Sequence, residues 1–567
     1  MDILDVIIIG AGWAGVCTMK HCLDAHLRAI VLEKSSDYGG VWNITNQPSV
    51  YANTYSVTSK YYLSMSDFPI PEDYPEFPHH TLVMDYMRLY IDHFHVDKHV
   101  SLNSEVIQVE KIDGLWNVSY KTQWGTTTRQ SHNIALCTGQ NSICLNYPDI
   151  DTSKFRGKIL HASTFDESIM NDCLNKRILI YGGSDTAADI AVELTNNMYT
   201  ATKYNGKKKF GFTGPNGSIN ENAKTIVYMS MRKGRWIQRR TGGAHEPADM
   251  FYNRIVNAVL KSTSKENIKL WFTPQLQFWW GKSGHGIPEW ETDAGYLNSY
   301  YVKSADILPK ITFGEVIPLR DITTINSTSV ITVDEEEIDI DVIIFATGYK
   351  GMSCYTFIPE AIKKGHYYDH IFMIEDPTVV KVGFIRPYLT SIPMIIEMQS
   401  RYVAAVFAKK CKLPDAPSMM KAYTLMKEVQ AKEFKYDSER VEGIIDPYDY
   451  MDMVAVKIGA KPSFIGIAAS DPKLFYYILF HTWSHFVYRL NDADPTKKEI
   501  ARQQILALEE NGTSKHVEKK ITNIVWKFLF YLLLIIISIV ILLIYSSSIY
   551  NYMSSLYRTY VKKYLKT

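Results

Sequence analysis

An apolar run followed at once by a glycine-rich turn constrains the fold of this chain more than any other feature. Residues Val6–Ile9 are all apolar, and the next six residues read Gly-Ala-Gly-Trp-Ala-Gly before a helical stretch to about Ala25. Four consecutive apolar residues are typical of a strand buried in a parallel sheet. Gly10 permits the tight turn, Gly12 lets the backbone approach a pyrophosphate, and Gly15 lets the helix pack closely on the strand. The pattern predicts a dinucleotide-binding unit.

A second strand supplies the acidic residue that such a unit uses to hold a ribose. The apolar run Ala29–Leu32 ends in Glu33, 23 residues after Gly10, where a carboxylate accepts hydrogen bonds from ribose hydroxyls. Strand, helix and acid are in register, so this unit is predicted to bind the first nucleotide. The contacts expected from it are Gly10, Gly12, Ala14, Gly15 and Glu33.

A degraded copy of this unit lies further along the chain. Its strand, Arg177–Tyr181, leads into Gly-Gly-Ser-Asp-Thr-Ala, with serine and alanine in place of the second and third glycines. Close approach to a phosphate then depends on Gly182 and Gly183. The next strand, Thr225–Met229, is followed by Arg232 rather than by an acid. A guanidinium can bind a 2′-phosphate through two hydrogen bonds, so the second nucleotide is predicted to be NADPH; the alternative is an ordinary surface arginine.

Composition restricts the class of protein and its partners. The 61 basic and 60 acidic residues nearly cancel, so the overall charge offers no case for binding nucleic acid. Seven cysteines without a CxxC pair indicate reduced thiols that face the cytosol. The histidines and aspartates between residues 92 and 99 follow no ligand spacing, and no metal site is expected.

An apolar segment near the C-terminus predicts attachment to a membrane. Phe528–Tyr545 is an uncharged run of 18 residues, and the expected helix covers 524–545. The N-terminus carries Asp2 and Asp5 and has no basic region before its apolar run, which argues against a secretory signal. We therefore expect a C-terminal membrane anchor with the other domains in the cytosol; a buried core helix is the alternative.

Two further strands suggest how the domains are arranged. Ile134–Cys137 and Val342–Ala346 are apolar runs that both end in Thr-Gly, and we interpret the first as leaving one domain and the second as returning to it. The predicted fold class is α/β, with two Rossmann-like dinucleotide-binding domains, the NADP domain inserted in the FAD domain, and a C-terminal transmembrane helix. The expected ranges are 1–165 and 331–512 for the FAD domain, 170–330 for the NADPH domain with a surface insertion at 196–224, and 524–545 for the anchor.

Several longer motifs resemble those of the flavin-containing monooxygenases, over nearly the whole chain. Phe155–Phe165 fits the pattern FxGxxxHxxx(Y/F), and its final phenylalanine, where the Baeyer–Villiger type has tryptophan, places it nearer the N- and S-oxygenating type. The other similar segments are Asp37–Trp42 with its GGxW, Asp67–Pro75, the FATGY of Phe345–Tyr349, Tyr450–Asp452, Ile458–Pro462 and Tyr488–Leu490.

The resemblance implies a reaction. In the family, NADPH reduces FAD, O2 adds at the flavin C4a atom, and the resulting hydroperoxide, shielded by NADP+, oxygenates soft nitrogen or sulfur nucleophiles of small lipophilic molecules. The flavin carries this chemistry, so no side chain is expected to be catalytic. The resemblance also implies an endoplasmic reticulum membrane, while the oligomeric state stays open. The further contacts it implies are Gly40, Val41, Trp42 and Thr58 for FAD, and Ser56, Gly182, Gly183, Thr186, Ala187, Asp189 and Arg232 for NADP.

One residue departs from the family pattern at a place that matters for the reaction. Val57 stands where the family has an asparagine whose amide is expected to form a hydrogen bond near the flavin and nicotinamide. Valine offers no such group. Three alternatives therefore stay open beside N- or S-oxygenation: an NADPH oxidase that releases H2O2, a Baeyer–Villiger monooxygenase, and a flavoprotein with little turnover that binds nucleotides or senses redox state.

Overall fold

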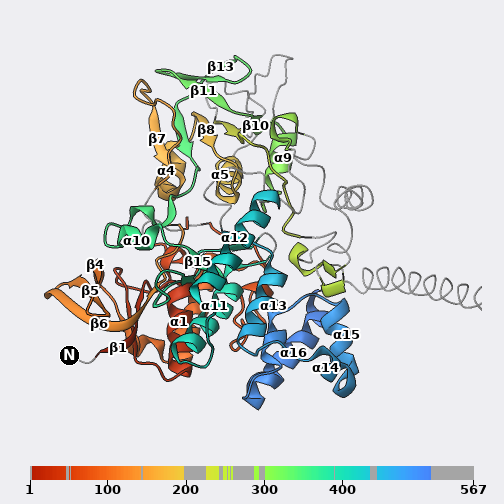
Figure 1. Cartoon of the computed structure of the whole chain (residues 1–567). Coiled ribbons are helices and arrows are strands. Elements are labelled where there is room, and N and C mark those ends of the chain that lie inside the picture. The colour runs from red at the N-terminus through yellow and green to blue at the C-terminus, as the bar shows by residue number, and fades with distance from the viewer. Residues whose placement is uncertain are drawn as a thin grey trace, which may run out of the picture. The chain divides into compact units, whose positions relative to one another are not determined.

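The computed structural model of this chain contains two large sheets, of which the first is mixed and the second is all parallel. It describes residues 3–45, 50–51, 53–141, 145–196, 225–241, 247–251, 253–255, 257–258, 287–292, 301–387, 390–433 and 443–512. The predicted membrane helix at 524–545 lies outside these residues, and so does the predicted insertion after Asn196. Parallel strands alternate with helices in both sheets (Figure 1), which confirms the α/β class with Rossmann-like domains.

The first sheet is built around the N-terminal strand. Its nine strands run in the order β15-β16-β17-β6-β1-β2-β3, with β5 added beside β6 and β4 beside β5. The N-terminal strand lies between two parallel neighbours and its residues Val6–Ile9 are buried, which is why the run carries no polar residue. The strands are β1 (Leu4–Ile9), β2 (Ala29–Leu32), β3 (Val100–Ser101), β4 (Glu105–Ile112), β5 (Leu115–Thr122), β6 (Gly125–Leu136), β15 (Tyr367–Tyr368), β16 (Phe372–Met373) and β17 (Val379–Lys381).

The second sheet has five strands, all parallel, in the order β10-β9-β8-β14-β7. These strands are β7 (Lys158–His161), β8 (Arg177–Tyr181), β9 (Ile226–Ser230), β10 (Val316–Leu319) and β14 (Val342–Phe345). Helix α5 (Asp185–Asn196) follows β8, as the degraded glycine turn predicts. Two small sheets complete the strands of the described residues: β11 (Ile322–Ile325) with β12 (Ser329–Thr332) and β13 (Glu337–Asp339), and β18 (Arg386–Pro387) with β19 (Ile444–Ile445).

The predicted domain boundaries at 165 and 331 need correction. Strand β14 pairs with both β7 and β8, so all three belong to the second sheet. The prediction that Val342–Ala346 returns the chain to the first domain is therefore wrong, and the first part of that domain ends before β7. The chain rejoins the first sheet at β17, which pairs in parallel with β6. An apolar run that ends in Thr-Gly identifies a buried parallel strand, but its partners are distant in sequence and the run does not reveal them.

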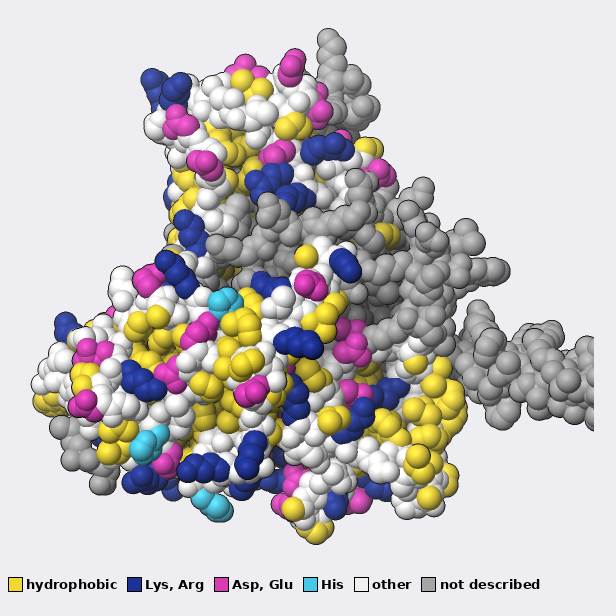
Figure 2. Space-filling model, viewed as in Figure 1, with side chains coloured by type: hydrophobic (Ala, Val, Ile, Leu, Met, Phe, Trp, Pro, Cys, Tyr) yellow, Lys and Arg dark blue, Asp and Glu magenta, His cyan; other side chains and the backbone are white. Residues whose placement is uncertain are grey.

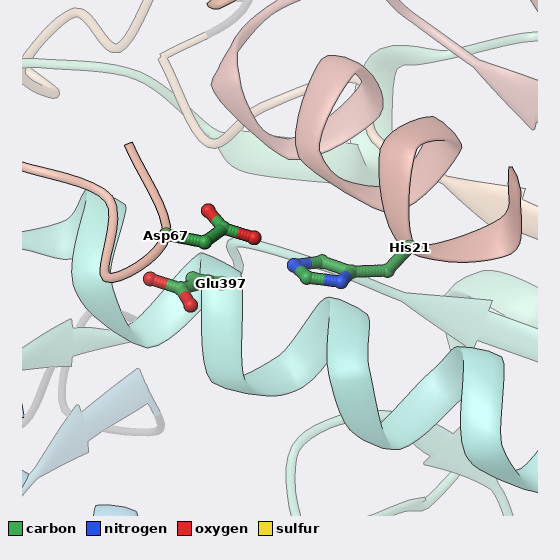
Figure 3. Close-up of side chains that lie close together, drawn as sticks. All are labelled: His21, Asp67 and Glu397. Carbon is green, nitrogen blue, oxygen red and sulfur yellow. The ribbon is translucent and has the colours of Figure 1, made fainter. Parts of the chain in front are cut away.

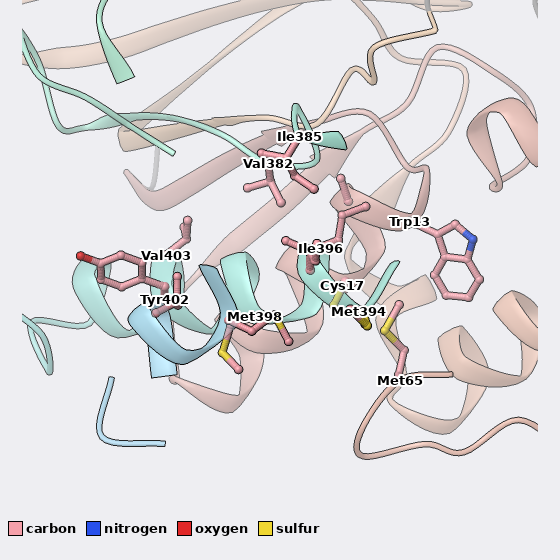
Figure 4. Packing of buried hydrophobic residues seen from close by; sticks show 14 of the residues in the cluster. Trp13, Cys17, Met65, Val382, Ile385, Met394, Ile396, Met398, Tyr402 and Val403 are labelled. Carbon is pink, nitrogen blue, oxygen red and sulfur yellow. The ribbon is translucent and has the colours of Figure 1, made fainter. Parts of the chain in front are cut away.

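The longer helices gather around the first sheet. Helix α11 (Ile392–Phe407) packs on α1 (Trp13–Asp24), and Figure 4 shows Cys17 among Met394, Ile396 and Met398 of α11. Thr18 and Ser400 add a hydrogen bond of 3.0 Å between their hydroxyls. The other helices are η1 (Gly40–Trp42), α2 (Lys60–Leu63), α3 (His80–His93), η2 (Val96–His99), η3 (Ala162–Thr164), α4 (Glu167–Asp172), η4 (Ala248–Phe251), η7 (Pro288–Trp290), α9 (Ile307–Thr312), η9 (Gly351–Cys354), α10 (Glu360–Lys363), α12 (Ala416–Glu433), α13 (Pro447–Lys457), α14 (Phe464–Ser470), α15 (Pro472–Phe480), η11 (His485–Arg489) and α16 (Pro495–Gly512).

A buried network of charges joins α1 to distant parts of the chain. The Lys20 ammonium contacts the Asp67 carboxylate, and Arg489 Nη2 lies 2.9 Å from Asp67 Oδ2 and 2.7 Å from Glu397 Oε1. All four side chains are buried. Burial raises the pKa of Glu397, but the nearby positive groups, with Arg489 the strongest of them, together outweigh it and lower this pKa to about 2. Both carboxylates are therefore ionised and balanced by two cations.

The same carboxylates stand near a histidine in an arrangement that resembles a metal site. Figure 3 shows the His21 imidazole pointing toward Asp67 and Glu397, and one potential ligand atom of each lies within 4.8 Å of the others. Lys20 and Arg489 already neutralise the two carboxylates. A divalent cation would add two positive charges to a balanced buried network, so we interpret the group as structural.

The surface carries one apolar area that bears on membrane contact. Figure 2 shows charges of both signs interspersed on the face viewed, and apolar side chains gathered over α14 and α15. Ile465 of α14 is 86% exposed and Tyr476 of α15 is 38% exposed. Among the described residues, no helix combines the length and the apolar character needed to cross a bilayer.

We expect Arg489→Met to lower the free energy of unfolding by about 3–5 kcal/mol, because it leaves two buried carboxylates with one cation. The measurement is urea unfolding followed by circular dichroism. Arg502→Met is the matched control, since the partner of Arg502 is Asp471 on a partly exposed side of the protein and such a pair contributes at most about 1 kcal/mol. Equal losses in the two variants would contradict a dominant role of the buried network.

Candidate dinucleotide-binding site

The first glycine turn admits no side chain at two of its positions. Gly10 has a φ of +103°, and a Cβ there would stand 2.6 Å from the carbonyl oxygen of Cys137 at the end of β6. A Cβ at Gly15 would stand 1.7 Å from the carbonyl oxygen of Gly10. The turn therefore presses against both the neighbouring strand and its own helix, which explains the two outer glycines.

The start of α1 suits an anion. Gly12 is the residue before the helix, it receives no side-chain cap, and the first turn contains no acidic residue. Free N–H groups and the helix dipole favour a phosphate at such an end. Glu33 stands beside this turn, where its carboxylate accepts hydrogen bonds from Ala11 N at 2.6 Å and from Ser35 N at 2.8 Å. Its remaining lone pairs are available for ribose hydroxyls.

A large cavity, which we call the dinucleotide cavity, opens over this turn. Its volume is about 650 Å³, within the range of cofactor sites. The predicted FAD contacts that line it are Gly10, Gly12, Ala14, Glu33, Gly40, Val41, Trp42 and Thr58. Gly15 lies beneath the turn instead, against Gly10. The predicted NADP contact Ser56 and the atypical Val57 also line the cavity. The exposed backbone of the glycine turn, the Glu33 carboxylate and the volume of the cavity all fit a bound FAD.

Other lining residues were not singled out from the sequence. Gln140 follows the Thr138–Gly139 strand end, and its amide nitrogen donates to the carbonyl oxygens of Gly383 and Ile385 at 2.8 Å each. Arg386 Nε donates to Gln140 Oε1 at 3.0 Å. The Thr-Gly pair was a usable signal for Gln140, whereas no motif surrounds Arg386.

One cysteine departs from the predicted reduced state. Cys354 lines the dinucleotide cavity and is disulfide-bonded, while Cys17, Cys22, Cys137, Cys173 and Cys411 are free thiols. The prediction that all cysteines are reduced is therefore wrong for Cys354. Counting cysteines and their spacing does not reveal which distant thiols the fold brings together.

The second glycine turn repeats the geometry of the first and changes its chemistry. Gly182 has a φ of +147°, and a Cβ there would stand 2.4 Å from the carbonyl oxygen of Ala346 at the end of β14. Ser184 Oγ accepts a hydrogen bond from Ala187 N at 3.3 Å, so a side chain caps the helix where a phosphate would otherwise bind. Thr186 is exposed and Ala187 is buried in the first turn of α5.

Two carboxylates on α5 hold the chain around Lys303. Asp185 accepts from the backbone N of Lys303, and Asp189 lies 2.9 Å from Arg240 Nη2 and also accepts from the Ser304 hydroxyl. Arg240 Nε in turn donates to the carbonyl oxygen of Lys303 at 2.9 Å. The carboxylate of Asp189, which was predicted to contact the nucleotide, thus binds Arg240 and Ser304 of the protein instead. Asp185 and Lys303 line the dinucleotide cavity, and neither was predicted.

Arg232 and the second turn do not line that cavity. Arg232 is exposed just after β9, within hydrogen-bonding reach of the Tyr181 hydroxyl, which itself donates to Asp321 Oδ1 at 2.8 Å. Gly182, Gly183, Thr186, Ala187 and Asp189 are likewise absent from its lining, while Ser56 lies there. Asp185 and Lys303 are the residues that bring the second unit to the wall of the dinucleotide cavity.

Two glycine turns, each after a strand with parallel neighbours in its own sheet, and residues of both units around one cavity define an oxidoreductase of the two-dinucleotide class. A family model described as flavin-binding monooxygenase-like matches residues 4–203 and 215–551. The chain therefore belongs to the flavin-binding monooxygenase-like family and is a flavin-dependent enzyme, as the sequence resemblance predicts.

Relatives and solved structures agree with this assignment. The chain is 28% identical to dimethylaniline monooxygenase (N-oxide-forming) 2 of Cavia porcellus over 89% of this chain and 91% of the relative. It is 27% identical to human flavin-containing monooxygenase 2 over the same shares. S-allyl-L-cysteine S-oxygenase from Allium sativum has a TM-score of 0.57 at 18% identity, covering 90% of this chain and 99% of the other. NADP+-bound cyclohexanone monooxygenase from Rhodococcus sp. Phi1 has a TM-score of 0.55 at 14% identity, covering 83% and 98%. Both structures share the fold.

We expect Arg232→Ala to raise the KM for NADPH about 10- to 100-fold and the KM for NADH less than about twofold, because only NADPH carries the 2′-phosphate. Initial rates of flavin reduction with each nucleotide are the measurement. Arg320→Ala is the matched control, since Arg320 follows β10 as Arg232 follows β9. If only Arg320→Ala lost the preference for NADPH over NADH, the 2′-phosphate would be bound by Arg320, and the role predicted for Arg232 would be wrong.

Proposed function

We propose that this enzyme uses NADPH and O2 to oxygenate soft nitrogen or sulfur atoms of small lipophilic molecules. The observation that carries the proposal is the dinucleotide cavity, where the flavin-type glycine turn and residues of the second unit line one space. The whole-length match to relatives named for N-oxide formation supports this reaction over other flavin chemistry.

The residues of the cavity bind and orient the cofactors. Glu33 and the start of α1 would hold the ribose and pyrophosphate of FAD, and Asp185 and Lys303 place the second unit at the same cavity. FAD, when bound here, would supply the redox chemistry between NADPH and O2. Leu63, Ile392 and Ile396 give part of the wall an apolar surface that limits access of water to the reacting atoms.

A second candidate function follows from Val57. This side chain lines the dinucleotide cavity and offers no hydrogen-bonding group at its wall. An unassisted site would release H2O2 instead of transferring oxygen, which makes an NADPH oxidase the main competitor. Baeyer–Villiger oxygenation and a low-turnover flavoprotein are the other outcomes that the same experiment separates.

The deciding experiment is to reduce the purified holoenzyme with NADPH, admit O2, and measure oxygenated product and H2O2 with a thioether, a tertiary amine or a cyclic ketone present. We expect at least half of the oxidised NADPH to appear as sulfoxide or N-oxide. Stoichiometric H2O2 with every substrate would establish the oxidase, and lactone formation the Baeyer–Villiger reaction. Failure of NADPH to bleach the flavin would leave the low-turnover alternative.

We also propose that residues 524–545 anchor the enzyme in the endoplasmic reticulum membrane. Support comes from the uncharged run Phe528–Tyr545 and from the apolar surface of α14 and α15, since exposed apolar areas mark contacts with membranes or proteins. Deletion of 524–567 is expected to move the protein from the carbonate-washed membrane pellet to the supernatant. Retention of the truncated protein in the pellet would show that the apolar run is dispensable for attachment.

A further inference from the structure

A much smaller cavity, which we call the side pocket, adjoins the dinucleotide cavity. Its volume is about 20 Å³, and it shares Val57, Lys303 and Thr390 with the larger cavity. Its other lining residues are Gln238, Arg239, Arg240, Ala248 and Asp249. A space of this size holds about one water molecule, and a water is stable there only if two to four polar partners surround it.

Three polar atoms of the side pocket are buried without a partner in the described part of the chain. They are Oε1 of Gln238, Oδ1 of Asp249 and Oγ1 of Thr390. Buried polar atoms are almost always hydrogen-bonded in folded proteins, because an unmade bond destabilises the native state. Three such atoms around one small cavity indicate a polar ligand between them.

The walls of the side pocket are fixed, so these atoms have little freedom to pair with one another. The other carboxylate oxygen of Asp249 accepts from Ser59 N at 2.7 Å, and Gln238 N donates to Val302 O at 2.7 Å. Among the cations that line the side pocket, Arg240 is bound to Asp189, and Lys303 attracts the Asp249 carboxylate without a hydrogen bond to it among the described contacts. Oδ1 of Asp249 therefore still lacks a hydrogen-bond donor among the described residues.

We propose that Gln238, Asp249 and Thr390 hold an ordered water molecule beside Val57, and that this water supplies the polar contact to the bound cofactors that valine does not. The presence of the water is inferred from the side pocket alone, whereas its effect on the reaction rests on the proposed function. Water donates to the Asp249 and Gln238 oxygens and accepts from the Thr390 hydroxyl, which leaves one lone pair for an N–H group in the dinucleotide cavity.

A crystal structure of the FAD- and NADP+-bound enzyme at about 1.8 Å or better tests the water directly. The expected result is a water peak within about 3.2 Å of all three side-chain atoms. Side chains rotated so that they close the side pocket, or a pocket without density, would overturn the proposal.

Thr390→Val tests the same water through stability. If a water is bonded to the hydroxyl, its loss lowers the midpoint of thermal unfolding of the holoenzyme by about 2 °C. If the side pocket is dry, removal of an unpaired hydroxyl leaves the midpoint unchanged or raises it, and the proposal fails. Thr54→Val is the matched control, because the Thr54 hydroxyl is also buried and unpaired but lines neither cavity.

The effect on the reaction is tested by combining Thr390→Val with Val57→Asn. We expect Thr390→Val to raise H2O2 released per NADPH at least twofold, and to have no effect once Val57→Asn places an amide beside the side pocket. Equal increases in both backgrounds would show that the water does not act at the position of Val57. If NADPH fails to reduce the flavin, the proposed function is wrong, while the water is still decided by structure and stability.

Discussion

The pairing of Arg489 and Lys20 with two buried carboxylates is the interaction on which the first domain depends. Lys20 belongs to α1, the helix whose first turn forms the flavin-type glycine turn, and its partner Asp67 also binds Arg489 near the end of the described chain. Buried charges are tolerated only when their partners are in place. The orientation of α1 is therefore tied to α11 and η11, and the turn is positioned by residues more than 350 positions away in sequence, such as Glu397 and Arg489.

This network also explains why segments far apart in the chain carry the family resemblance. Asp67 begins one resembling segment and Arg489 lies in another, and their side chains meet at 2.9 Å. Tyr488 donates to Asp452 of a third segment, which also pairs with Arg254 at 3.0 Å. These segments stabilise the scaffold. Their agreement with the family therefore carries information about fold and cofactor orientation, and it leaves the choice of substrate to residues at the cavity wall.

Local features could be predicted from the sequence, and long-range partners could not. The strand at Val6–Ile9, its glycine turn and Glu33 lie within one short stretch of sequence, so their pattern could be recognised locally. The structure places them together as one unit. The membership of Val342–Phe345 in the second sheet and the partners of Asp189 depend on residues about 50 to 200 positions away. Lys303 was missed for the same reason, because nothing near it in sequence indicates that Asp185 binds its backbone.

In the second unit, the glycine turn after β8 keeps its backbone geometry although serine and alanine replace two of its glycines. Its polar side chains bind other parts of the protein. Ser184, which replaces the second glycine, caps α5, and Asp189, which was expected at the nucleotide, binds Arg240. The chain they hold carries Lys303 to the dinucleotide cavity and closes one wall of the side pocket. The side pocket lies beside Val57, and its wall is part of the chain that these contacts hold in place. A water in the side pocket can take the place of a side-chain amide at Val57 only if the backbone around the pocket is fixed. Asp185 and Asp189 of α5 fix that backbone through their bonds to Lys303 N and Arg240.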